Sequence, residues 1–147
     1  KTAQELFGDS LNNVKTLVAT SFSSGIFYNK GKGNFEFYAF PQEMQVSPLF
    51  AFATINSKQN GLLAAGNFSG VVPYEGRYDA DYGDVLLTGK DGKNRYVSAN
   101  LSGLLFRGEV RDIKALHTAK GIIYAVAFNN EVIRIFKQME PSQKIRG

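Results

Sequence analysis

The residues best suited to chemistry lie in one stretch of the chain, from Phe68 to Asp84. It combines aromatic rings, carboxylates and a guanidinium group, in Tyr74, Glu75, Arg77, Tyr78, Asp79, Asp81 and Tyr82. An aromatic ring can lie against the C–H face of a sugar while carboxylate and guanidinium groups bond to its hydroxyls. A hairpin connection normally takes two to five residues, whereas this one has about fifteen. We therefore predict that these residues bind a ligand, either a glycan or a peptide.

The same residues also allow a structural interpretation. Arg77 can pair with Asp79 or Asp81, and the tyrosines can pack the loop onto the fold, because a long loop needs internal pairing to be ordered. Glu75, Asp79 and Asp81 further raise the hypothesis of glycoside hydrolysis, which needs two carboxyl groups about 5 to 9.5 Å apart. Carboxylates within one loop more often form turns or ion pairs. We therefore predict no catalytic residues and no enzyme activity.

Other patterns of catalytic and metal-binding residues are missing from the sequence. His117 is the single histidine, which excludes a histidine cluster and an HExxH zinc site. The chain has no cysteine, which excludes disulfides and thiolate metal sites. Glycine pairs at 31/33 and 89/92 precede no helix with a Walker lysine, so they indicate hairpin turns rather than phosphate cradles. We predict no metal and no other cofactor.

Composition narrows the class of protein. The chain has 147 residues, of which 44% are hydrophobic and 20% charged, as expected of one globular domain. Its net charge of +4 comes from basic residues scattered singly, so we expect no nucleic-acid partner. The longest apolar run, Ile122–Phe128, is far shorter than the roughly 20 residues of a membrane helix. Lys1–Gly8 lacks the apolar centre of a signal peptide.

The elements that must position the loop are predicted to be strands. Short β-branched and aromatic runs alternate with Gly, Asn, Asp and Lys about every ten residues, which is typical of a meander of hairpins. The expected strands are Lys15–Phe22, Ser24–Tyr28, Phe35–Phe40, Leu49–Ile55, Gly61–Asn67, Val85–Thr88, Tyr96–Ser98, Gly108–Leu116, Ile122–Asn129 and Val132–Lys137. Ala3, Leu6 and Phe7 have helical spacing, so residues 1–13 are expected to hold a leading turn or short helix.

A weak internal repeat favours one architecture. In both Gly61–Asn67 and Gly121–Asn129, a glycine opens a nearly all-apolar strand that ends in asparagine, which indicates burial on both faces. The inner strands of propeller blades are buried in this way. We predict an all-β fold, a single partial β-propeller over residues 1–147 with two to three antiparallel blades near 14–46, 47–103 and 104–138. Because propellers close with four or more blades, further blades or another copy must complete it.

Several segments of the sequence resemble those of a known family. They are Ser24–Asn29 followed by Gly31–Phe35, Pro41 with Gln45–Pro48, Ala65–Phe68, Gly76–Gly83 and Arg107–Lys114. Together they resemble the C-terminal blades of bacterial FG-GAP or VCBS-repeat β-propeller proteins related to those that carry ASPIC/UnbV domains. The resemblance implies an exported repeat protein, periplasmic or associated with the outer membrane or cell surface, whose loops face a ligand or partner.

The same family commonly binds calcium in an Asp-rich loop resembling D-x-D-x-D-G. The corresponding loop here, Asn56–Gly61, has no carboxylate and places Lys58 where the cation would sit. We therefore expect no calcium in this loop.

Three hypotheses of function follow from the sequence. The first is a non-catalytic binding or scaffolding segment that contacts a glycan, peptide or protein partner through residues 68–84. The second is purely architectural, in which the segment completes a larger propeller or a homo-oligomer. The third and remotest is a glycan-hydrolysing enzyme.

Overall fold

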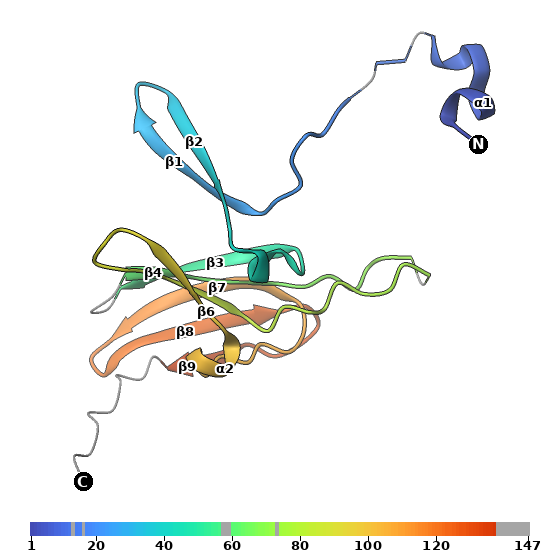
Figure 1. The fold of residues 1–147 in the computed structure, drawn as a ribbon. Coiled ribbons are helices and arrows are strands. Elements are labelled where there is room, and N and C mark those ends of the chain that lie inside the picture. Colours follow the sequence, from blue (N-terminus) through green and yellow to red (C-terminus); the bar gives the residue numbers. More distant parts are fainter. Residues whose placement is uncertain (13, 16, 57–59, 73, 138–147) are drawn as a thin grey trace.

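The computed structural model describes residues 1–12, 14–15, 17–56, 60–72 and 74–137. Within these ranges the chain is mostly antiparallel β-structure, arranged in three sheets (Figure 1). The strands are β1 (Gly25–Gly31), β2 (Asn34–Ala39), β3 (Leu49–Asn56), β4 (Asn60–Gly66), β5 (Asp84–Thr88), β6 (Asn94–Val97), β7 (Val110–Thr118), β8 (Gly121–Phe128) and β9 (Arg134–Lys137). The helices are α1 (Ala3–Phe7) and α2 (Ala99–Ser102), with 3-10 turns η1 (Gly8–Leu11) and η2 (Gln42–Gln45).

The central sheet is a four-stranded meander of β3, β4, β5 and β6 in chain order, and β7, β8 and β9 form a second sheet. One face of the central sheet packs on the second sheet, and the side chains between them form the main core. Alternate residues of β3 point into this core: Ala51, Ala53 and Ile55. Phe106, which precedes β7, is fully buried there, with its ring 4.7 Å from that of Phe136. Burial of these apolar surfaces holds the two sheets together.

The opposite face of the central sheet carries a smaller core. Met44 of η2 and Phe40 are buried against Ala64 and Leu86 of the sheet. β1 and β2 form a separate hairpin that stands on this side of the sheet (Figure 1). The Gln45 side chain anchors the base of the hairpin, because it accepts from the Ser24 N–H at 2.8 Å and donates to the Ser24 and Phe40 carbonyls. The smaller core therefore covers β4 and β5 on this face, whereas Phe52 of β3 stays 45% exposed.

Most of the predicted elements are present, and one is wrong. Nine of the ten expected strands correspond to β1–β9, and the expected N-terminal helical turn is α1, which a Thr2–Glu5 capping box begins. Lys15–Phe22 forms no strand in its described residues. Its side chains have strand propensity, but a strand needs a partner with which to share backbone hydrogen bonds, and Leu17 and Phe22 stay exposed. Helix α2 was not expected.

The prediction of two-sided burial holds for β4 and fails for β8. In β4, Leu63 and Ala65 face the main core while Ala64 faces the smaller one. In β8, Tyr124, Val126 and Phe128 are buried, but the alternate residues Ile123, Ala125 and Ala127 are only half-buried. No described element covers the outer face of the second sheet. The all-β class is thus confirmed, whereas a partial propeller with two to three blades stays a prediction.

Candidate functional site

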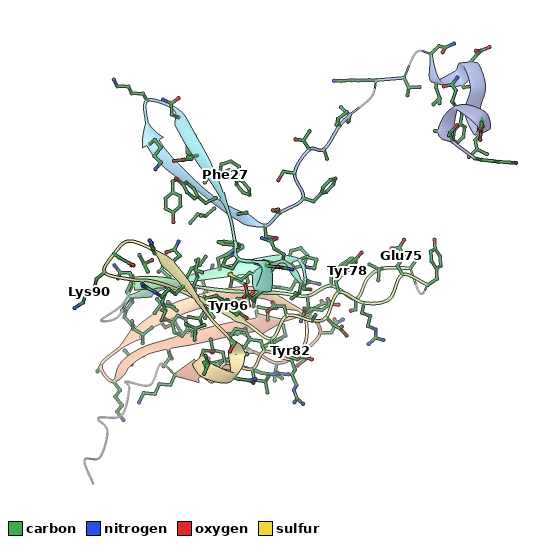
Figure 2. All side chains as sticks on the ribbon, viewed as in Figure 1. Phe27, Glu75, Tyr78, Tyr82, Lys90 and Tyr96 are labelled. Carbon is green, nitrogen blue, oxygen red and sulfur yellow. The ribbon has the colours of Figure 1, made fainter. Side chains whose placement is uncertain are left out.

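The connection between β4 and β5 is a long ribbon that projects from the end of the central sheet (Figure 1). Phe68 and Tyr78 pair across it through two backbone hydrogen bonds, of 2.7 Å from Phe68 N and 3.0 Å from Tyr78 N. Figure 2 shows Glu75 near the tip of the ribbon, Tyr78 part of the way along it and Tyr82 close to the sheets. The ribbon therefore has a root in the fold and a free end in solvent.

Asn67 holds the two sides of the root together. Its buried side-chain amide donates to the Asp81 carbonyl at 2.7 Å and to the Gly108 carbonyl at 3.0 Å, and its oxygen accepts from the Asp81 N–H at 3.0 Å. Asn67 also has a left-handed backbone with φ 78°, which asparagine tolerates better than most residues. One side chain thus joins the start of the ribbon, its end and the segment that leads to β7.

Asp81 completes this buried junction. Its two carboxylate oxygens accept from the Gly66 N–H at 2.6 Å and from the Gly83 N–H at 2.7 Å. Burial raises the pKa of Asp81, and the two backbone hydrogen bonds oppose that rise. Gly66 admits no side chain, since a Cβ there would lie 1.7 Å from the Pro48 carbonyl oxygen. Asp81 is therefore committed to the backbone rather than free to meet a ligand.

Glu109 ties the ribbon to the second sheet. Its carboxylate accepts from the Ser69 N–H at 2.7 Å, from the Ser69 hydroxyl and from the Asn129 amide at 2.9 Å, and it forms an ion pair with Arg111. Burial works to raise the pKa of Glu109, but these donors and the Arg111 charge together lower it. The Arg111 guanidinium also lies 4.8 Å from the centre of the Phe50 ring. The charge on Glu109 is thus already matched inside the fold.

Asp84 is a second buried carboxyl beside the junction. Burial is the main cause that raises its pKa to about 7; the Asp81 charge adds to the rise, and a hydrogen bond with Tyr96 opposes it. Burial and the neighbouring Asp84 raise the pKa of Tyr96 to about 12. One oxygen of Asp84 is buried with no hydrogen-bond partner among the described residues. The protonation state of this carboxyl therefore changes near neutral pH.

An open cleft of about 760 Å³ lies at the root of the ribbon. The ribbon and β6 with α2 contribute to it, together with the segment that leads into β7. Its lining residues are Asn67, Phe68, Ser69, Arg77, Asp79, Tyr82, Tyr96, Ser98, Ala99, Asn100, Leu105, Arg107, Gly108 and Glu109. The cleft thus offers aromatic rings, hydroxyl and amide groups and charges of both signs.

The structure brings together three of the seven predicted site residues and separates the others. Arg77, Asp79 and Tyr82 line the cleft. Tyr74, whose exposed fraction is 87%, and Glu75 lie at the free end of the ribbon, and Tyr78 is paired with Phe68 through its backbone part of the way along it. The ion pair of Arg77 with Asp79 or Asp81 that the sequence suggested is not found among the described residues, and Asp81 instead accepts from two backbone N–H groups.

The other wall of the cleft was not predicted from the sequence. Tyr96, Ser98 and Asn100 reach it from β6 and α2, and Arg107 reaches it from the segment before β7. Gly103, with a left-handed φ of 75°, ends α2 and was an available signal for that helix. Nothing local to these residues indicates that they face the ribbon, since only sheet packing brings residues near 80 and 100 together.

Within the described part of the chain, no group of three or more His, Cys, Asp or Glu side chains is placed to hold a metal ion. The Asn56–Gly61 loop, for which we expect no calcium, joins β3 to β4, and its residues 57–59 lie outside the described ranges. No helix in those ranges is long and apolar enough to cross a membrane.

No family model, no curated protein and no solved structure matches the chain. The resemblance to FG-GAP and VCBS repeats therefore stays a prediction that rests on the sequence segments alone.

We expect Asn67→Ala to destabilise the fold by about 3 kcal/mol or more, because it leaves buried backbone groups unsatisfied and puts alanine at a positive φ. Asn67→Gly restores the backbone freedom but not the hydrogen bonds, so it should recover only about 1 kcal/mol of that loss. Urea unfolding of both variants measures the two contributions. A loss below about 0.5 kcal/mol for Asn67→Ala would show that the junction is dispensable.

We expect Asp84→Asn to flatten the pH dependence of stability. The folded-state pKa of about 7 lies above the roughly 3.9 of an unfolded aspartate. The folded chain therefore holds an extra proton between these values, and the associated stability is lost as the pH rises through about 7. The neutral amide cannot lose a proton, so the variant should gain stability relative to the native chain between pH 5 and pH 8.

Urea unfolding at both pH values measures this difference. Asp79→Asn, which changes an exposed carboxylate in the same segment, is the matched control and should keep the native slope. An unchanged slope in Asp84→Asn would mean that Asp84 is ionised throughout this range.

Proposed function

We propose that this segment is a non-catalytic binding module that holds a polar ligand, a glycan or a peptide, in the cleft at the root of the ribbon. The observation that carries the proposal is the composition of that cleft. Tyr82 and Tyr96 supply aromatic surface, Arg77 and Asp79 supply charge, and small hydroxyl and amide side chains complete the lining. Concave sites with a few converging polar groups beside aromatic rings are the usual binding sites of proteins.

The rigidity of the root supports this proposal. A site binds tightly when its groups are held in place before the ligand arrives, since less conformational freedom is then lost. Asn67, Asp81 and Glu109 hold the backbone around the cleft through hydrogen bonds to main-chain groups. Arg77 and Tyr82 belong to the ribbon whose root these hydrogen bonds hold.

The carboxylates of the cleft support a role in binding rather than in hydrolysis. Glycoside hydrolysis needs two carboxyl groups on either side of the scissile bond. Of the two acidic residues that line the cleft, Glu109 is occupied by Ser69, Asn129 and Arg111. Asp79 alone is left for a ligand, which is sufficient to accept a hydroxyl hydrogen bond.

We expect Tyr82→Ala to weaken ligand binding by up to about tenfold, since a specific aromatic contact contributes roughly 0.5–1.5 kcal/mol. Tyr74→Ala is the matched control, because Tyr74 is an exposed tyrosine of the same ribbon outside the cleft. A thermal-shift screen of glycans and peptides finds the ligand, and calorimetry compares the variants. Loss of binding in Tyr74→Ala without loss in Tyr82→Ala would place binding away from the cleft, and no ligand at all would overturn the proposal.

A second candidate, the architectural role, is favoured by two bare apolar faces. On the hairpin, Phe27, Phe35 and Phe37 lie on one side, and 66% of Phe27 is exposed. On the second sheet, Leu116 pairs with Ile123 and Ile135 pairs with Ala125, and this stripe faces solvent. Large apolar patches on a protein surface mark sites of contact with other proteins. Each face thus exposes apolar side chains of the kind that are normally buried between packed sheets.

If copies of this chain cover these faces, we expect light scattering to show association that grows with concentration. Phe27→Lys should abolish it, because a charge cannot be buried in an apolar contact without a partner. Leu101→Lys is the control, since Leu101 is 82% exposed and belongs to α2 rather than to either face. A monomer at all concentrations would contradict pairing between copies.

A further inference from the structure

The charges that line the cleft are not equivalent. Four charged residues contribute to it: Arg77, Asp79, Arg107 and Glu109. Glu109 is neutralised by its ion pair with Arg111, which lies outside the lining. Among the described residues, the guanidinium groups of Arg77 and Arg107 have no hydrogen-bond or ion-pair partner, and the Asp79 carboxylate has none either. Two free positive charges thus face one free negative charge.

We propose that the ligand of this cleft is an anionic saccharide, one that carries carboxylate or sulfate groups. This inference rests on the proposed binding function and names the class of ligand. Arg77 and Arg107 bind the anionic groups, a ring of the saccharide lies against Tyr82, and Asp79 accepts hydrogen bonds from hydroxyls. The planar guanidinium group has donors at the spacing of two carboxylate or sulfate oxygens, so each arginine can bind an anion through two parallel bonds.

The surroundings of the two arginines favour a saccharide over an acidic peptide. The remaining polar lining consists of short hydroxyl and amide side chains, in Ser69, Ser98 and Asn100, which exchange hydrogen bonds with hydroxyl groups in both directions. Tyr82 is about half exposed, so its ring is accessible to a flat ligand. A peptide could instead bind by adding a strand to the open edge of β6, which reaches the lining through Tyr96, and the acidic peptide probe below tests that alternative.

The net charge of the chain also favours an anionic ligand. The chain carries +4, so an anionic ligand is attracted before contact, and this attraction weakens as salt is added. A specific site differs from such general attraction because it depends on where the charges lie. The variants must therefore separate the two arginines of the cleft from an equal charge elsewhere.

The matched control removes two charges at the opposite end of the fold. Lys90 lies in the turn between β5 and β6, and Lys120 lies in the turn between β7 and β8. Both strands that lead to these turns begin near the cleft and run away from it, and Figure 2 shows Lys90 far from the ribbon. Arg77→Gln with Arg107→Gln and Lys90→Gln with Lys120→Gln have the same net charge, two units below the native chain.

The experiment is calorimetric titration with four probes: a trigalacturonate, a sulfated trisaccharide, neutral maltotriose and an oligoglutamate peptide. We expect at least one acidic saccharide to bind about tenfold or more tightly than maltotriose, as expected for hydrogen bonds to charged groups. The double arginine variant should lose that advantage, and the double lysine variant should keep it. Comparison of the first two probes distinguishes carboxylate from sulfate as the anion.

Three results would overturn the inference while leaving the binding function in place. In the first, maltotriose binds more tightly than both acidic saccharides, and Tyr82→Ala weakens that binding. In the second, the oligoglutamate peptide binds more tightly than the saccharides. In the third, the double arginine variant and the double lysine variant lose the same amount of affinity for the acidic saccharide. Absence of binding by all four probes, with another ligand found in the thermal-shift screen, also overturns it. If no ligand of any class binds, the binding function fails as well.

Discussion

The structure depends on how the chain satisfies its polar backbone groups where it leaves β4. A ribbon cannot branch from a buried strand without exposing N–H and C=O groups to an apolar interior, and each unpaired group costs free energy. Asn67 and Asp81 meet this demand between them, because the amide and the carboxylate bond to backbone groups of the ribbon and of its neighbours. The bond from Asn67 to the Gly108 carbonyl extends the same junction to the second sheet.

This junction links sheet packing to the cleft. The two sheets hold each other through apolar side chains, with Phe106 between them, and the Phe106 N–H donates to the Tyr82 carbonyl at 2.9 Å. The backbone of a residue that lines the cleft is therefore bonded to the edge of the main core. Glu109 adds a polar connection on the other side of the root. The cleft thus lies beside backbone that these bonds hold, whereas Tyr74 is 87% exposed at the free end of the ribbon.

The two candidate functions concern different surfaces and are compatible. The cleft is polar and charged, and it lies at the end of the sheets from which the ribbon projects. The bare faces are apolar and belong to the hairpin and to the outer side of β7–β9. Burial of apolar area supplies affinity without direction, while placed polar groups supply selectivity. One surface is suited to assembly and the other to recognition.

The sequence by itself determined the strands, because their residues alternate and their turns carry Gly and Asn, whose preferences are local. It also located the ribbon, since no hairpin turn needs so many residues. Only the tertiary structure decided which ribbon residues can meet a ligand. Asp79 and Asp81 are both aspartates two residues apart, yet Asp79 lines the cleft and Asp81 is buried at the junction. It likewise decided that Lys15–Phe22 has no partner strand, and it brought Arg107 and Tyr96 to the ribbon. These outcomes depend on contacts between residues distant in sequence, which no local preference encodes.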